Sequence, residues 1–107
     1  MTTFDERERG FEANFSREQD MAFRIAARRN RLLGVWAAEL MGLTAEETDA
    51  YAKAVVQADF EEAGDEDVIR KLLGDLTSAG VDMDDSRIRN ALSEKAIDAR
   101  RQLLELK

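Results

Sequence analysis

A chain of 107 residues has room for one folded domain, and its 44% hydrophobic content is enough for a buried core. It contains no proline, cysteine or histidine, which excludes disulfides, thiolate metal sites and the usual general base of enzymes. The net charge of −7 argues against nucleic acid or an anionic membrane as the main partner. Because no apolar run approaches the roughly 20 residues that span a bilayer, and the amino terminus is charged, we expect a cytoplasmic protein.

The first two helices are marked by glycine and a capping sequence. A first helix is expected over 4–41, where Gly42 is placed to end it. Thr44 and Glu47 have the spacing of a capping box, in which each side chain bonds the other residue's backbone N–H. They predict that a second helix begins here.

The last two helices are marked in the same way. Gly64 is expected to end the second helix and Asp65 to cap the start of the third. Gly80 ends the third, and Asp84 is the expected cap of the fourth. Short connections favour antiparallel neighbours, so the sequence predicts an all-α four-helix bundle.

Apolar residues recur at helical spacing in all four segments, which predicts one core face on each helix. The expected core residues are Ala22, Ala26, Leu33, Trp36 and Leu40; Tyr51, Val55, Val56 and Ala58; Val68, Ile69, Leu72, Leu73 and Leu76; and Ile88, Leu92, Ala96, Ala99 and Leu103.

Charge is distributed unevenly along the chain. Residues 35–85 hold 14 acidic residues against three basic ones, whereas residues 1–34 carry a net charge of +1 and residues 86–107 one of +3. The middle of the chain is therefore expected to form the acidic surface.

The helix lengths do not match, and the mismatch leaves an amino-terminal arm. A helix over 4–41 is about 57 Å long, whereas the other three segments give about 30, 22 and 31 Å. No partner helix is long enough to cover the first helix. Roughly its first third must project from the bundle or be disordered.

The arm carries a phenylalanine face. Phe4, Phe11 and Phe15 fall within about 40° of one another around a helix. Gly10 opposes helix formation by about 1 kcal/mol relative to alanine, so we expect a mobile arm that becomes helical when this face binds a groove. The alternatives are that the arm folds back over an end of the bundle, or that it is a disordered terminus without a role.

The other candidate site consists of four arginines of the first helix. Arg24, Arg28 and Arg31 share one face of this helix, and Arg29 lies beside them. This face could dock an acidic surface or a phosphate. Pairing with the acidic middle of the chain, or simple solvation, is the favoured interpretation.

The run from Asp59 to Asp67 is rich in oxygen ligands around Gly64, which suggests calcium. In the EF-hand pattern, however, Ala63 falls where an oxygen ligand is needed and Arg70 where the bidentate glutamate belongs. A capped corner between helices explains these residues, so no metal is expected.

The residue pattern does not indicate a catalytic site. The serines have no histidine to activate them, and no glycine-rich phosphate loop is present. We therefore expect a binding protein that is not an enzyme and needs no cofactor.

Several blocks of the sequence together resemble the zeta inhibitor subunits of alpha-proteobacterial F-type ATP synthases. The matching blocks are residues 4–12, 27–38, 50–53, 58–68, 80–81 and 88–89. The resemblance implies a four-helix bundle with a mobile, intrinsically disordered arm. It also implies that the arm inserts as a helix into the catalytic head (alpha, beta and gamma subunits) near the rotor, which blocks rotation in the hydrolytic direction and permits synthesis.

The resemblance divides the chain into an inhibitory arm, residues 1–19, and a bundle domain, residues 20–107. The implied contacts of the arm are Phe4, Asp5, Arg7, Arg9, Phe11, Glu12 and Phe15. Family members often carry lysine in place of Arg9 and Asn14, and the change at Asn14 removes a positive charge. The protein would be peripheral to the inner membrane through the synthase, and monomeric when free.

Two other functions remain open. One is a bundle that binds a small molecule or nucleotide between its helices, with the arm as a lid. The other is an acidic adaptor protein whose partner binding does not need the arm.

Overall fold

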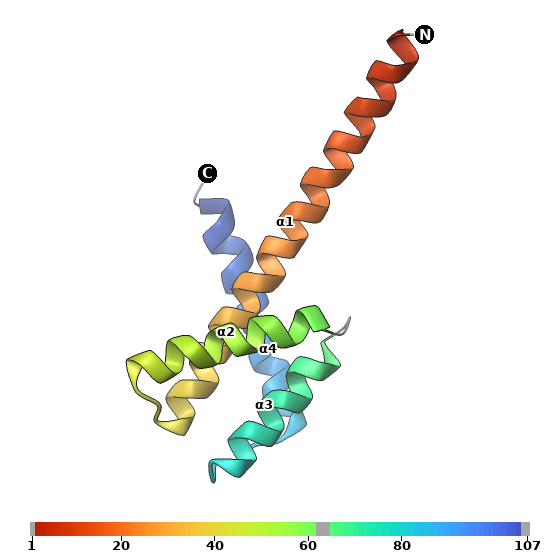
Figure 1. Ribbon diagram of the computed structural model, residues 1–107. Coiled ribbons are helices and arrows are strands. Elements are labelled where there is room, and N and C mark those ends of the chain that lie inside the picture. Colours follow the sequence, from red (N-terminus) through yellow and green to blue (C-terminus); the bar gives the residue numbers. More distant parts are fainter. Residues whose placement is uncertain (1, 62–64, 106–107) are drawn as a thin grey trace.

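The computed structural model describes the backbone of residues 2–61 and 65–105, and the side chains of residues 19–58 and 65–105. The described backbone forms four α-helices and no strand. The helices are α1 (Thr2–Met41), α2 (Ala45–Glu61), α3 (Glu66–Ser78) and α4 (Asp85–Glu105). The predicted all-α four-helix fold is confirmed (Figure 1).

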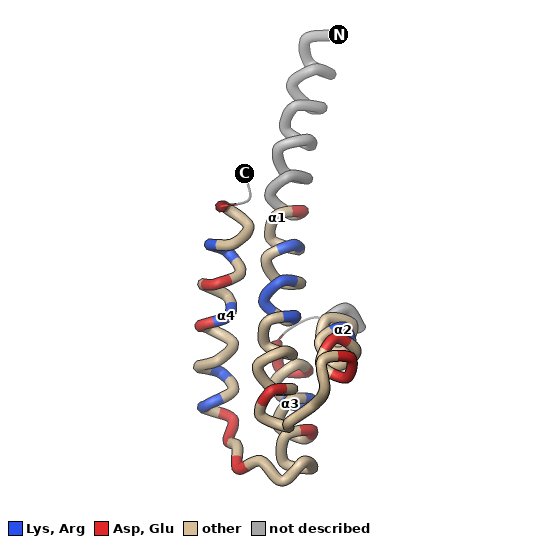
Figure 2. Tube along the Cα trace, turned by 90° about the vertical axis from the view of Figure 1, so that its left-hand side faces the viewer, with Lys and Arg blue, Asp and Glu red and all other residues tan. Residues whose placement is uncertain are grey.

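Helix α1 is the central element, because its packing against α2 and against α4 is the most extensive between any two helices, and it also contacts α3. Helix α3 also contacts α2 and α4. Figure 2 shows α4 beside α1 and running in the opposite direction. With 40 residues against 21 in α4, α1 is about 60 Å long and continues past the end of α4, which measures about 32 Å (Figure 1).

Glycines end α1 and α3 as predicted. Gly42 has a φ of 73° and Gly80 a φ of 82°, a left-handed conformation that glycine adopts without steric cost. After α3, the N–H of Val81 donates to the carbonyl of Leu76 at 2.9 Å, which closes a Schellman motif. The equivalent bond closes α1.

Two of the predicted helix caps are confirmed. The Thr44 N–H donates to Glu47 Oε1 at 2.9 Å, and the Glu47 N–H donates to Thr44 Oγ1 at 3.2 Å. This reciprocal capping box lowers the pKa of the Glu47 carboxyl group, since the backbone N–H of Thr44 stabilises the carboxylate. At α4, Asp84 Oδ1 accepts from the Arg87 N–H at 2.8 Å.

Asp65 lies directly before α3, as predicted, but the prediction that its side chain caps this helix is wrong. Asp65 precedes α3, but its side chain makes no capping hydrogen bond and its backbone is already helical, with a φ of −78°. Its carboxylate instead accepts from Arg29 Nη2 of α1 at 2.9 Å, so the ion pair takes the place of the cap. Gly64, which was expected to end α2, lies outside the described residues.

The core joins all four helices. Its buried apolar residues are Leu33, Ala37, Val55, Val68, Ile69, Leu72, Leu76, Ile88, Ala91 and Leu92. Trp36 was expected in the core and packs against it while only partly buried. Two expectations are wrong, because Ala22 and Leu40 are exposed. In the part of the chain that the structure describes, no helix is long and apolar enough to cross a membrane.

Candidate functional site

The predicted inhibitory segment belongs to the amino-terminal part of α1. Helix α1 runs without interruption from Thr2, so the expected boundary between residues 19 and 20 falls within one continuous helix. The seven expected contacts are Phe4, Asp5, Arg7, Arg9, Phe11, Glu12 and Phe15. Their side chains lie outside the described residues, and their contacts therefore stay a prediction.

A groove lies at the base of this segment, between α1, α2 and α4. Its volume is about 750 Å³. The lining residues are Phe23, Arg24, Ala27, Arg28, Arg31, Lys53, Val56, Gln57 and Leu103. Phe23 is 54% exposed, so the groove offers an aromatic ring and several cationic groups on the same surface.

Two cations of the groove share one carboxylate. Arg31 Nη2 lies 2.9 Å from Asp49 Oδ1, and Lys53 Nζ lies 3.1 Å from Asp49 Oδ2. The hydrogen bond from Arg31 is the main cause that lowers the pKa of Asp49, followed by that from Lys53. Arg28 Nη1 donates to the neutral amide oxygen of Gln102 at 3.3 Å.

The fourth cation of the groove, Arg24, pairs with Asp20 within α1 at 3.1 Å. Among the side chains that the structure describes, the four cationic groups are therefore paired with two carboxylates, those of Asp20 and Asp49. In a chain with a net charge of −7, this groove is a local region of positive charge.

Pairing with the acidic middle of the chain, which was the favoured interpretation of the arginine face, is confirmed for Arg29 and Arg31. Arg29 of α1 reaches Asp65 at 2.9 Å, and Arg31 reaches Asp49 at the same distance. Both carboxylates belong to the acidic middle of the chain. These pairs tie α1 to α2 and to the start of α3, and their contribution to stability is small where both partners are exposed.

Close backbone packing holds α1 against α2. A Cβ atom added at Gly34 would lie 2.8 Å from Ala52 Cα and 3.2 Å from Val55 Cγ2. One turn away, Asn30 is fully buried, and its Oδ1 accepts from Arg29 Nε at 3.1 Å. The part of α1 that follows the arm is thus fixed in the bundle.

The acidic corner is occupied by ion pairs in its described part. Glu66 receives two hydrogen bonds from Arg89 of α4, each 2.9 Å long, and Asp67 lies 3.5 Å from Arg70. Residues 62–64 lie outside the described residues. Among the described residues, no group of three or more acidic side chains is arranged to hold a metal ion.

The fold is that of an all-α protein whose first helix extends beyond the other three helices. A family model described as ATPase inhibitor subunit zeta matches residues 1–102, and the chain belongs to this family. It is therefore a regulatory subunit that inhibits an ATPase, and family membership implies association with ATP synthase.

Comparison with solved structures supports the same fold. A structure determined by solution NMR is 44% identical in sequence, with a TM-score of 0.72. The comparison covers 81% of this chain and 99% of that one. Among the curated proteins, no match is found.

Sequence reasoning missed several residues that matter for the architecture and the surface, among them Gly34, Asn30, Ile97 and Leu104. Gly34 and Asn30 lie in α1, where the expected core residues were Ala22, Ala26, Leu33, Trp36 and Leu40. Ile97 and Leu104 are exposed apolar residues off the core face of α4. A helical projection places Ile97 about 180° from Ile88, and this signal could have found it.

Proposed function

We propose that this protein inhibits ATP hydrolysis by inserting residues 1–19 as a helix at a catalytic interface of the F-type ATP synthase head, near the rotor. The observation that carries the proposal is the length of α1, which has 40 residues against 21 in the next longest helix. The partners would be the alpha, beta and gamma subunits, and the protein would be peripheral to the inner membrane through them. No substrate is turned over.

The continuity of α1 supports a mechanical role. The same helix that carries residues 1–19 is locked into the core by Leu33 and Ala37 and packed against α2 at Gly34. A force that acts on the inserted arm is therefore transmitted to the bundle along one helix. A flexible linker at this point would not transmit it.

The width of the bundle would limit how far the arm can insert into the head. Across its long axis the chain measures 27 by 23 Å, whereas a single helix with its side chains is about 10–12 Å wide. A gap between subunits that admits one helix does not admit the bundle. The bundle would therefore remain at the surface of the head and set the depth of insertion.

Replacement of the phenylalanine face by alanine tests the proposal. The triple variant Phe4→Ala, Phe11→Ala, Phe15→Ala should lose inhibition of ATP hydrolysis by the isolated head. A matched control on the opposite side is Glu6→Ala with Arg17→Ala, which lie about 200° and 220° from Phe4 around the helix. The control should inhibit like the unchanged protein. Equal inhibition by the triple variant would contradict the proposal.

A second candidate function rests on the groove at the base of the arm. Its excess of arginine and lysine, next to the exposed Phe23 ring, suits an anionic ligand with an apolar part, such as a nucleotide. Dose-dependent stabilisation by nucleotide alone in a thermal-shift titration, lost in Arg28→Ala, would support it. No shift at millimolar nucleotide would contradict it.

A further inference from the structure

The outer face of α4 presents two large apolar side chains that the bundle does not use. Ile97 is 67% exposed and Leu104 52% exposed. They are seven residues apart and so lie on one side of the helix, and Ile97 points about 180° away from the buried Ile88. Helix propensity gives no reason for isoleucine at this exposed position, because alanine and lysine favour a helix more.

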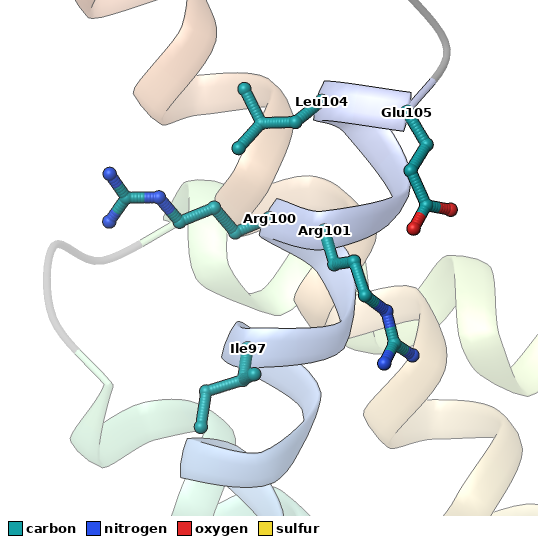
Figure 3. A pocket seen from close by; sticks show the side chains of 5 residues that line it. All are labelled: Ile97, Arg100, Arg101, Leu104 and Glu105. Atoms are coloured by element: carbon teal, nitrogen blue, oxygen red, sulfur yellow. The ribbon is translucent and has the colours of Figure 1, made fainter.

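Arg100 and Arg101 lie between these two apolar residues in the sequence. Ile97, Arg100, Arg101 and Leu104 line a hollow of about 440 Å³ together with Glu105 (Figure 3). Arg101 lies 3.3 Å from Asp98, an exposed pair of little strength. Arg100 makes no ion pair or hydrogen bond among the side chains that the structure describes.

This pattern is complementary to a surface that combines apolar side chains with carboxylates. Exposed apolar anchors next to arginine are the composition that interface centres favour. Arginine can bind a carboxylate through two parallel hydrogen bonds, which adds direction to the contact. In Arg100 both of these donors are available.

A second copy of this chain does not fit the same face. An antiparallel pair of α4 helices that brings Ile97 opposite the Leu104 of a second copy also brings Arg100 opposite its Arg101. Two guanidinium groups would then meet at the centre of the contact, and juxtaposed like charges oppose association. The occupant is therefore a different protein surface.

The face lies at the same end of the bundle as the base of the arm. Leu103, next to Leu104 in the chain, lines the groove with Phe23 and Arg24 of α1. Figures 1 and 2 both show the carboxyl end of α4 at the end of the bundle from which α1 extends. A partner that holds the arm can therefore reach this face of α4 without passing around the bundle.

We infer that Ile97, Arg100, Arg101 and Leu104 form a second docking surface, which binds an acidic and partly apolar surface of the ATPase head. This inference rests on the proposed function, since it takes the same partner. The arm blocks rotation, and the α4 surface holds the bundle against the head while it does so. Its contribution is affinity, so its loss should raise the concentration needed for inhibition.

The test uses full-length variants and measures both binding to the head and inhibition of ATP hydrolysis. Ile97→Ser with Leu104→Gln removes the apolar pair, and Arg100→Glu with Arg101→Glu reverses the charge. Matched controls are Leu40→Gln, which changes a 42% exposed apolar residue at the other end of α1, and Arg70→Glu on α3. Circular dichroism and thermal unfolding verify that each variant is folded.

Both α4 variants should bind about tenfold more weakly or worse, as expected when central contacts of an interface are removed. Full inhibition should still be reached at higher concentration, and the controls should match the unchanged protein. Unchanged affinity of both α4 variants, with inhibition by the unchanged protein intact, would overturn the docking surface alone. Failure of the unchanged protein to bind the head would overturn the docking surface and the proposed function together.

Discussion

Gly34 of α1 and Ala52 of α2 bring the two helix backbones into direct contact. A Cβ atom at Gly34 would lie 2.8 Å from Ala52 Cα, a backbone atom that cannot move aside without shifting α2. Ala37 and Ala38, about one turn further along α1, are both fully buried and also have small side chains. The helix that carries the arm is therefore fixed by its smallest residues.

Gly34→Ala should destabilise the protein despite the better helix propensity of alanine. Overpacking costs about 1–3 kcal/mol, and the propensity gain returns about 1 kcal/mol, so we expect a net loss of up to about 2 kcal/mol. Gly74→Ala is the matched control, because an added Cβ there meets nothing within 4 Å. It should stabilise the protein by about 0.5–1 kcal/mol. Urea unfolding measures both, and equal effects of the two changes would refute the account of the α1–α2 contact.

Tyr51→Phe should weaken the contact between α2 and α3. The Tyr51 hydroxyl donates to Asp75 Oδ2 at 2.7 Å in a half-buried position, where Lys71 also lies 3.1 Å from the same oxygen. Loss of the hydroxyl removes one hydrogen bond, which is worth about 1 kcal/mol. The free energy of unfolding at pH 7 reports the loss, and an unchanged value would show that the bond contributes nothing.

The same tyrosine predicts a change of stability at alkaline pH. Burial raises the pKa of Tyr51 above its ordinary value of 10.0, and the hydrogen bond to Asp75 and its charge add to the rise. The unfolded state therefore loses its phenolic proton first, and stability should fall as the pH rises above 10. In Tyr51→Phe this part of the pH dependence should be absent. The comparison of unfolding midpoints between pH 9 and pH 11 checks it.

Acid should weaken the contact between α3 and α4 through Glu66. The hydrogen bonds from Arg89 are the largest cause that lowers the pKa of Glu66, and the charge of Arg89 adds to them. The stabilisation is therefore complete above the ordinary glutamate value of 4.5 and is lost as the pH falls through the lowered pKa.

Arg89→Gln should flatten the pH dependence of the unfolding midpoint below pH 4.5. Arg100→Gln serves as the control, because Arg100 is an exposed arginine of α4 that makes no ion pair among the described side chains. Between pH 6 and pH 8 stability should be nearly constant, since the chain has no histidine. A steep dependence in that range, or an acid dependence that Arg89→Gln leaves unchanged, would contradict this assignment.

The sequence predicted the parts of the fold that depend on neighbouring residues. The capping box at Thr44, the cap at Asp84 and the glycine ends at Gly42 and Gly80 are all local, and the structure confirms each of them. The apolar face of α3 follows directly from helical periodicity. Four of its five expected core residues are buried, and Leu73 is partly buried.

Features that depend on the partner helix could not be predicted in this way. The carboxylate of Asp65 pairs with Arg29, which is 36 residues away in the chain, instead of capping its own helix. Gly34 is needed because α2 crosses at that point, and nothing in the sequence around Gly34 shows the crossing. Leu40 lies on the expected stripe, but it is 42% exposed while its neighbour Met41 packs against the core, so the covered face of α1 is turned away from Leu40 at this end.

The same distinction applies to the candidate sites, because some of their features follow from the sequence and others depend on the fold. The resemblance and the helical projection predict the arm and its phenylalanine face, and the family model agrees with the family resemblance over residues 1–102. The groove between α1, α2 and α4 required the three-dimensional arrangement, because its lining residues come from 23–31, 53–57 and 103.

The most direct test of the central claim is ATP hydrolysis by the matching ATPase head, measured with the full-length protein and with a form that lacks residues 1–19. The account predicts that the full-length protein inhibits hydrolysis and that the truncated form, folded by circular dichroism, does not. Inhibition by both forms to the same extent would contradict the role of the arm. No inhibition by the full-length protein, at concentrations where binding to the head is shown independently, would contradict the inhibitory mechanism itself.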